Sequence, residues 1–377
     1  MLTGHPIFWI LLAAVAAPLL AEIPLGFKLP VVVLEVLLGI LIGPHVLELV
    51  HFGRMGAEAW PFLVIMFTVG MAATLFMAGM ELDFSGLKGR PLALATGGWM
   101  VSALLGITVV GLLDVIPQER SPMMVTLALC TTGLGVLVPV FRDGGQLETG
   151  FGRFFMAAGT LGEVGPIVGM SLFLSQRYSS WQEMGFLLAF LAIVGITIAT
   201  GMRARPPKLL ALLGRHMTSS SQLPVRIALL TLATFLVLAM EFGFEGIFGA
   251  FAAGIVVGQA TRGEDGKPFR EKIEAAFFGW FYPFFFVGTG IKFDVTALGK
   301  DLTTMLLVPA FALLFLLVRG APVFLYRDAI AKAERLPFAL TCAVPSLSLV
   351  VVITEIGAHT KLMNPDIATA LISAALL

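Results

Sequence analysis

Glu163 is the residue of this sequence whose type and position point most directly to chemistry. It lies near the middle of the apolar stretch 151–175, in the string GTLGEVGPIVG. A charged side chain at that depth of a membrane span costs about 2.5–3.5 kcal/mol to insert, and such residues usually mark an ion or proton path. A carboxyl group there can hold either a proton or a metal cation. The structural alternative is a glutamate that hydrogen-bonds a hydroxyl group or pairs with an arginine.

Two other apolar stretches, 121–141 and 336–356, are interrupted at their centres by small polar residues and helix breakers. Carbonyl groups freed by such breaks at membrane depth must line a cavity or bind a ligand. Matching interruptions in corresponding segments predict two discontinuous helices around an ion site. The alternative is a pair of ordinary kinked helices with hydroxyl groups bonded back to the backbone. The interrupting residues are Thr131, Thr132 and Gly133 in the first stretch and Pro345, Ser346 and Ser348 in the second.

Two more charged residues lie inside apolar stretches. Arg319 lies about two thirds of the way along 302–326. Its side chain could reach the interface, or it could supply an ion pair or a standing positive charge to the site. Glu35 lies near the start of 29–50, where a structural, hydrogen-bonded role is expected.

The composition explains why these residues must be positioned by membrane helices. Hydrophobic residues make up 58% of the 377 residues and charged residues 13%, compared with about 25% charged in an average soluble domain. The chain is therefore predicted to be an all-α integral membrane protein. The net charge of zero argues against a nucleic-acid partner. Nucleotide-binding, zinc-protease and serine-hydrolase motifs do not occur, and the five histidines show no metal spacing, so neither an enzyme nor a cofactor is predicted.

Thirteen apolar segments can be marked, and each is predicted to be a transmembrane helix. The connections between them are short except for two expected loops, 202–222 and 261–274. The basic stretch 202–222 is interpreted as a linker on the anionic inner leaflet, with a regulatory surface as the alternative. The segments run over 7–24, 29–50, 60–81, 92–116, 121–141, 151–175, 183–201, 223–241, 244–260, 275–291, 302–326, 336–356 and 363–377.

The distribution of basic residues predicts the orientation of these segments. Of the 24 lysines and arginines, 17 lie in or beside the loops after odd-numbered segments, and 6 lie on the opposite side. Positive residues favour the cytoplasm, so the N-terminus is expected outside and the C-terminus inside the cell membrane. An odd helix between two sets of six predicts an inverted repeat within a single exchanger domain, 1–377. Its parts would be a first repeat over 1–182, a linker over 183–222, and a second repeat over 223–377. The last segment is short and still apolar at the chain end, so it is expected either to span as a short helix or to belong to a longer protein.

Six strings in this order resemble the membrane domain of the monovalent cation:proton antiporter-2 family, which includes Kef-type potassium transporters and Nap-type sodium/proton antiporters. Their joint order and spacing make the match specific, and they cover almost the whole chain. The strings are LEVLLGILIGP, FMAGMELDFSGLKG, TTGLGVLVPVFRDGGQLETGFGRFFMAAGTLGEVGPI, GIFGAFAAGIVVGQ, FYPFFFVGTGIKFDV and VPSLSLVVVITEIG.

The resemblance implies a homodimer in which a core domain moves like an elevator against a dimerisation domain. It implies that two broken helices cross beside the essential carboxylate. Residue by residue, Glu163 matches the family's ion-binding aspartate, and Arg319 matches the basic residue on the helix before the second crossing helix. Thr131 and Thr132 match the unwound part of the first crossing helix, and Pro345 and Ser346 match that of the second.

The sequence departs from the family at Gly162-Glu163, where relatives usually carry a polar residue followed by aspartate. A single carboxylate that binds either one proton or one monovalent cation predicts one-for-one, electroneutral exchange of Na⁺ or K⁺ for H⁺. Glu163 would be the shared site, and Thr131 and Thr132 would supply oxygen ligands for the cation. Two alternatives stay open: a gated potassium efflux channel, and a carrier of an organic or anionic solute that uses Arg319.

Overall fold

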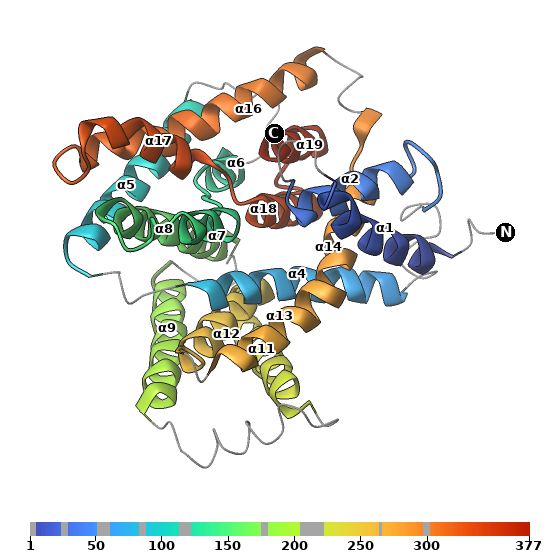
Figure 1. Cartoon of the computed structure of the whole chain (residues 1–377), viewed down its shortest axis with the longest axis horizontal. Coiled ribbons are helices and arrows are strands. Elements are labelled where there is room, and N and C mark those ends of the chain that lie inside the picture. Colours follow the sequence, from blue (N-terminus) through green and yellow to red (C-terminus); the bar gives the residue numbers. More distant parts are fainter. Residues whose placement is uncertain are drawn as a thin grey trace. The chain divides into compact units, whose positions relative to one another are not determined.

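The computed structural model describes residues 5–23, 29–50, 61–82, 88–112, 122–174, 180–203, 222–263, 266–296 and 302–377. Within these residues every regular element is a helix, which confirms the predicted all-α class (Figure 1). The chain contacts divide it into two units, each made of two separate stretches of sequence. Unit 1 comprises Met1–Leu82 and Leu174–Phe293, and unit 2 comprises Asp83–Phe173 and Asp294–Leu377.

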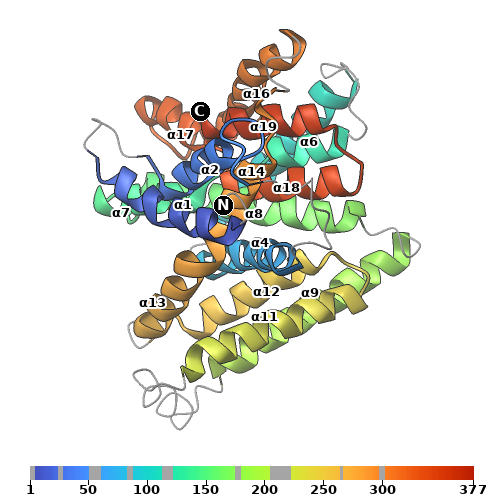
Figure 2. The same ribbon diagram turned by 90° about the vertical axis from the view of Figure 1, so that its right-hand side faces the viewer.

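Unit 1 is built from long apolar helices that approach each other closely at glycines. A Cβ atom on Gly79 would lie 2.2 Å from the carbonyl oxygen of Phe251, and one on Gly254 would lie 1.9 Å from that of Phe76. The backbones of α4 and α12 therefore touch, as small residues allow in membrane helices, and Figure 2 shows these two helices side by side. The helices of unit 1 are α1 (Pro6–Ala21), α2 (Val31–Ile42), α4 (Pro61–Glu81), α9 (Ser180–Arg203), α11 (Leu223–Glu241), α12 (Gly246–Ala260), α13 (Lys267–Ala276), the π-helical η4 (Phe277–Phe281) and α14 (Tyr282–Lys292).

Unit 2 contains the two interrupted segments. Four residues separate α6 (Pro122–Leu129) from α7 (Leu134–Asp143), and three residues separate α17 (Arg335–Ala343) from α18 (Leu347–His359). Helices α6 and α18 pack side by side (Figure 1). The remaining elements are α5 (Arg90–Gly106), the π-helical η2 (Ile107–Leu112), α8 (Gly150–Leu174), α16 (Leu302–Gly320), the 3-10 helices η5 (Ala321–Tyr326) and η6 (Lys332–Glu334), and α19 (Pro365–Leu376).

Every one of the thirteen predicted segments contains at least one helix, and the two predicted discontinuous helices are confirmed. Six helices of the described residues are long and apolar enough to cross a membrane, and five shorter apolar helices accompany them. Most of the stretch 202–222 lies outside the described residues, so its predicted role stays a prediction.

The predicted loop 261–274 is wrong over most of its length, because α13 begins at Lys267 and continues through η4 into α14. The sequence KPFREKIEAA is amphipathic, with Phe269 and Ile273 buried and the charged residues elsewhere on the helix. Continuous apolar runs do not reveal such a helix, because its apolar residues recur with a period of 3.6 residues and do not form an unbroken stretch. Proline in its first turn costs nothing, because that N–H group has no helical partner.

Candidate functional site

The two broken helices cross at their breaks and exchange hydrogen bonds there. The N–H group of Gly133 donates to the carbonyl oxygen of Val344 at 2.9 Å. The hydroxyl group of Thr132 donates to the carbonyl oxygen of Cys342 at 2.8 Å. The N–H group of Ser346 donates to the hydroxyl oxygen of Thr131 at 3.3 Å. Backbone groups that each helix loses at its break are thus satisfied by the other helix, which solves the problem that a break creates at membrane depth.

Gly133 is the residue that lets the breaks meet. A Cβ atom at this position would lie 2.7 Å from the carbonyl oxygen of Pro345, which is a backbone atom of the other helix. A side chain would push the two breaks apart. The interruption at Gly133 predicted from the sequence therefore coincides with the point of closest approach.

Helix α8 contributes to the crossing through its proline. Pro166 has no N–H group, so it cannot donate to the carbonyl oxygen of Gly162 four residues earlier. That carbonyl oxygen instead accepts a hydrogen bond of 3.2 Å from the N–H group of Thr132. The proline in α8 therefore supplies the acceptor that the first broken helix needs.

Glu163 lies on α8 at the same level, and 3% of its surface is exposed. Its Oε1 atom accepts a hydrogen bond of 3.3 Å from the N–H group of Leu134, the first residue of α7. The amino-terminal end of a helix carries a partial positive charge, so α7 stabilises a negative carboxylate at this position. In the described part of unit 2, Glu163 is the one acidic side chain that is buried.

Arg319 is buried as well, with 4% of its surface exposed, and it does not extend to an interface. Its Nε atom donates to the Thr132 hydroxyl oxygen at 2.9 Å, and its Nη2 atom donates to the carbonyl oxygen of Ala158 at 3.0 Å. A longer bond of 3.4 Å joins Nη1 to the hydroxyl oxygen of Ser102, which itself donates to the carbonyl oxygen of Val318. The guanidinium group therefore ties α5, α8 and α16 to the first break.

The position of Arg319 explains why residue 162 is a glycine. A Cβ atom on Gly162 would lie 2.7 Å from the Thr132 hydroxyl oxygen and 2.8 Å from Nη2 of Arg319. The space that a polar side chain would need at this position is occupied by the guanidinium group and the threonine. The departure from the family pattern noted above is thus matched by the local packing.

The structure brings most of the predicted site residues together. The contacts described above connect all of these residues except Ser348, which lies half-buried in the first turn of α18. Unit 2 contains the whole set: Thr131, Thr132, Gly133, Gly162, Glu163, Arg319, Pro345, Ser346 and Ser348. Glu35 is also buried, but it belongs to α2 in unit 1. In the described residues, no three His, Cys, Asp or Glu side chains gather as a metal cluster would require.

Sequence reasoning missed Ser102 and the backbone carbonyl groups of Ala158, Cys342 and Val344. Ser102 could have been noticed, because it is a polar residue inside the apolar segment 92–116; the structure shows that it is fully buried. The carbonyl groups carry no signal of their own in a sequence, since every residue has one. Their roles follow from which turns of the helices face each other.

The comparisons with known proteins agree with one another. The family model described as "Sodium/hydrogen exchanger, transmembrane" matches residues 10–377. The chain is 25% identical to YjbQ of Bacillus subtilis (strain 168), which carries the name of an Na(+)/H(+) antiporter; the match covers 98% of this chain and 60% of the length of YjbQ. It is also 25% identical to the Na(+)/H(+)-K(+) antiporter GerN of Bacillus cereus, over 82% of this chain and 78% of GerN.

The fold is similar to that of the sodium proton antiporter MjNhaP1 from Methanocaldococcus jannaschii. The TM-score is 0.67 and the sequences are 20% identical, and the match covers 100% of this chain and 94% of the other. The likeness shows the fold.

Proposed function

The chain belongs to the sodium/hydrogen exchanger family, and we propose that it exchanges a monovalent cation, Na⁺ or K⁺, for H⁺ across a cell membrane. The observation that carries this proposal is Glu163, a buried carboxyl group at the crossing of two broken helices. The names of relatives such as YjbQ and GerN support cation and proton exchange as a class. The name of GerN includes both cations, so it favours neither for this chain.

Glu163 is proposed to bind the cation and the proton in turn. A carboxylate can hold one of the two at a time, so binding of the cation displaces the proton. Each half of the cycle then carries one positive charge in opposite directions, and the exchange is electroneutral. The hydrogen bond from the Leu134 N–H group holds the ionised carboxylate in place until a cation or proton neutralises it.

The two threonines at the first break are proposed to supply oxygen ligands for the cation. Each hydroxyl group already donates one hydrogen bond and accepts one, Thr131 to Ala128 and from Ser346, and Thr132 to Cys342 and from Arg319. A hydroxyl oxygen has two acceptor lone pairs, so one lone pair remains on each for a hard cation. Carbonyl oxygens at the breaks can complete such a shell.

Arg319 is proposed to fix the elements of the site against one another and to give the site a permanent positive charge. Its bonds to Thr132 and Ala158 fix the first break against α8. The side chains given a role here, those of Glu163, the two threonines and Arg319, all belong to unit 2, so a movement of this unit as one body would carry them together. We also propose that the protein works as a homodimer with its N-terminus outside, as the resemblance and the positive residues predict.

Transport in proteoliposomes tests the proposed exchange. Purified protein is reconstituted with a pH-sensitive dye inside, the membrane potential is clamped, and Na⁺ or K⁺ gradients are imposed in each direction. Cation-driven proton movement is expected for the wild type and is expected to vanish in Glu163→Gln. Glu148→Gln is the matched control, because it makes the same chemical change at an exposed residue of the same unit.

The other outcomes each contradict a part of the proposal. Cation flux without proton movement would indicate a channel. A response to neither cation would favour the carrier of an organic or anionic solute. Full exchange in Glu163→Gln would show that Glu163 is not the shared binding site for the cation and the proton.

A further inference from the structure

Basic residues gather at one end of unit 2, where three candidate membrane spans begin or end. The spans are Arg90–Gly111, Thr304–Tyr326 and Lys332–His359, and the turn 327–331 joins the last two. Lipid headgroups lie where the apolar part of a span ends, so these residues are at headgroup depth. We call this set the basic cluster, and its members are Lys88, Arg90, Arg327, Lys332 and Arg335.

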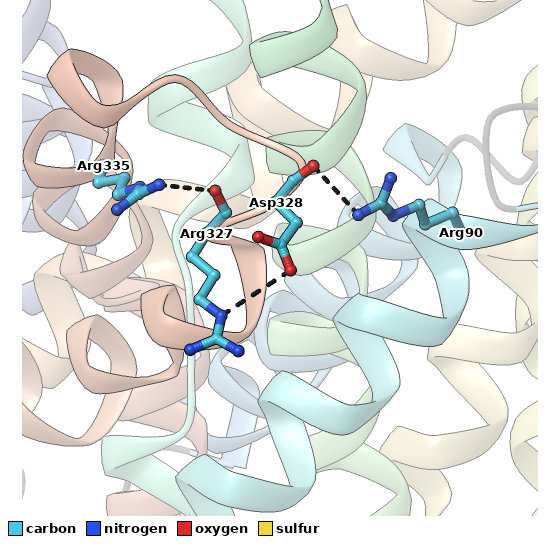
Figure 3. Close-up of polar contacts among 4 residues, drawn as sticks. All are labelled: Arg90, Arg327, Asp328 and Arg335. Atoms are coloured by element: carbon cyan, nitrogen blue, oxygen red, sulfur yellow. Dashed lines mark hydrogen bonds and ion pairs between the residues drawn. The ribbon is translucent and has the colours of Figure 1, made fainter.

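Two hydrogen bonds to the backbone of the turn hold the cluster together (Figure 3). The Nη2 atom of Arg90 donates to the carbonyl oxygen of Asp328 at 3.1 Å, across 238 positions of the sequence. From the other side, the Nη2 atom of Arg335 donates to the carbonyl oxygen of Arg327 at 2.6 Å. The turn therefore fixes two guanidinium groups on either side of the residue that carries a third.

The charge of the basic cluster is only partly compensated. Its segments, 88–90 and 327–335, contain five positive side chains and two negative ones, Asp328 and Glu334, which leaves a net charge of +3. The nearby start of α8 adds one residue of each sign, Glu148 and Arg153. Among the described residues, the one ion pair of the cluster joins Arg327 to Asp328 at 3.8 Å, with both side chains about three-quarters exposed. Such an exposed pair contributes little to stability.

Most N–H groups of the three arginines are available to a ligand. Among the described residues, Arg90 and Arg335 each donate one hydrogen bond, although a guanidinium group has five N–H bonds. The Nε atom of Arg327 lies too far from Asp328 for a hydrogen bond. Guanidinium groups bind phosphate through two parallel hydrogen bonds. Three of them around one turn therefore suit a phosphate group.

Exposed apolar side chains lie directly beside the basic ones. Phe324 and Leu325 belong to η5, just before Arg327, and 76% and 42% of their surfaces are exposed. Leu336 follows Arg335, and 68% of its surface is exposed. These residues belong to candidate membrane spans, so lipid acyl chains are their natural surroundings. A phospholipid can contact both the charged and the apolar part of this surface, whereas a free phosphate ion contacts the charged part alone.

We propose that the basic cluster binds the phosphate group of an anionic phospholipid, whose acyl chains lie along Leu336 and the exposed side chains of η5. The distribution of basic residues predicts that both segments of the cluster lie on the cytoplasmic side, where anionic lipids make the membrane surface negative. The bond from Arg90 to Asp328 supports their placement on one side, because it joins the two segments. This lipid site lies outside the crossing of the broken helices and goes beyond the proposed exchange.

Native mass spectrometry of the full chain measures this binding. Protein purified in a neutral detergent is titrated with phosphatidylglycerol or with phosphatidylcholine, and the fraction that retains lipid is compared. Phosphatidylglycerol should be retained at concentrations roughly tenfold lower than phosphatidylcholine, because the phosphatidylcholine headgroup carries no net charge. Equal retention of the two lipids would overturn the proposal.

Two neighbouring variants should shift the binding in opposite directions. Arg327→Gln should weaken phosphatidylglycerol binding about fivefold, the loss expected for one basic residue near an anionic surface. Asp328→Asn should strengthen it by a similar factor, because it removes a negative charge from the site. Both variants break the same ion pair, so a purely structural role of the turn would shift both in the same direction. Arg226→Gln, at an exposed position of α11 in unit 1, is the control and should bind as wild type does.

Inorganic phosphate tests the other source of the same chemistry. It has no acyl chains, so it should displace phosphatidylglycerol only at concentrations far above those at which the lipid binds. Leu336→Ser should weaken phosphatidylglycerol binding and leave the effect of phosphate unchanged. Displacement by phosphate at low concentration, together with unchanged lipid binding in Leu336→Ser, would indicate a free-phosphate site and overturn the lipid proposal.

The remaining outcomes separate this inference from the proposed exchange. Equal phosphatidylglycerol binding in wild type, Arg327→Gln and Asp328→Asn would show that the lipid binds elsewhere and would overturn the proposal. Glu163→Gln should retain phosphatidylglycerol as wild type does, although it should not exchange ions. Selective lipid binding without any cation/proton exchange in wild type would overturn the proposed function and leave the lipid site standing.

Discussion

Gly133→Ala probes the contact on which the crossing depends. The new methyl group would lie 2.7 Å from the carbonyl oxygen of Pro345, which is 0.7 Å closer than the 3.4 Å at which ordinary contact begins. The obstructing atom belongs to the backbone of the other broken helix, so no flexible side chain can give way. The two breaks must therefore separate by about that distance.

The size of the effect follows from the bonds that this separation stretches. The Gly133–Val344 hydrogen bond would lengthen from 2.9 Å to about 3.6 Å, and the Ser346–Thr131 bond, already 3.3 Å, would be lost. Overpacking costs about 1–3 kcal/mol and each lost hydrogen bond about 1 kcal/mol. Alanine also reduces the conformational freedom of the unfolded chain, which offsets about 0.4–1 kcal/mol of this loss in stability. The expected net loss is about 2–4 kcal/mol.

The assay is thermal unfolding in detergent, followed by transport of the folded fraction in proteoliposomes. Gly195→Ala in α9 is the matched control, because its added Cβ atom meets nothing within 4 Å and alanine should stabilise the helix by up to about 1 kcal/mol. Gly133→Ala should unfold at a clearly lower temperature than wild type and Gly195→Ala, and it should exchange ions slowly. Equal stability and equal transport in the two variants would refute the close crossing of the breaks.

Three further substitutions test the surroundings of Glu163. Gly162→Asn should displace Arg319 and lower the free energy of unfolding by about 3–5 kcal/mol, because the new side chain overpacks the site and breaks a charged hydrogen bond. Thermal unfolding measures this loss, and a stability equal to that of wild type would mean that the guanidinium group lies elsewhere. Thr132→Val should lower the free energy of unfolding by about 1–3 kcal/mol, because it leaves the Cys342 carbonyl group without its donor. The Thr354 hydroxyl group bonds within its own helix, so Thr354→Val should lower it by less than half as much. Pro166→Ala should restore a donor that competes for the Gly162 carbonyl group and slow transport relative to Pro309→Ala; equal rates would show that the Thr132 N–H group does not need this acceptor.

Residue types that are costly inside a membrane were sufficient to find most of the candidate site from the sequence. Glu163 and the polar breaks at Thr131 and Pro345 stand out, because lipid tolerates a carboxyl group or a broken helix only for a structural or chemical reason. The same reasoning left two alternatives for Arg319. The structure decides against an interfacial side chain, since Arg319 is buried and bonded to Thr132, 187 positions away.

The partners of these residues could not be predicted in the same way. The acceptors at the crossing are backbone carbonyl groups of Cys342, Val344 and Gly162, and a carbonyl group looks alike in every residue of a sequence. The role of Pro166 becomes visible once the chain places Thr132 next to the carbonyl group that the proline frees. The amphipathic α13 is hidden for a different reason, because its buried residues are spaced along the helix and form no unbroken apolar run.

Proton release on cation binding tests the central claim, that Glu163 is the shared site, most directly. Na⁺ or K⁺ is added to purified protein in weakly buffered detergent solution, and the released protons are measured over a range of pH. Because a bound cation displaces the proton from its ligand, wild type and Glu148→Gln should release up to about one proton per chain, and Glu163→Gln should release none. Release from Glu163→Gln equal to that from wild type would contradict the account.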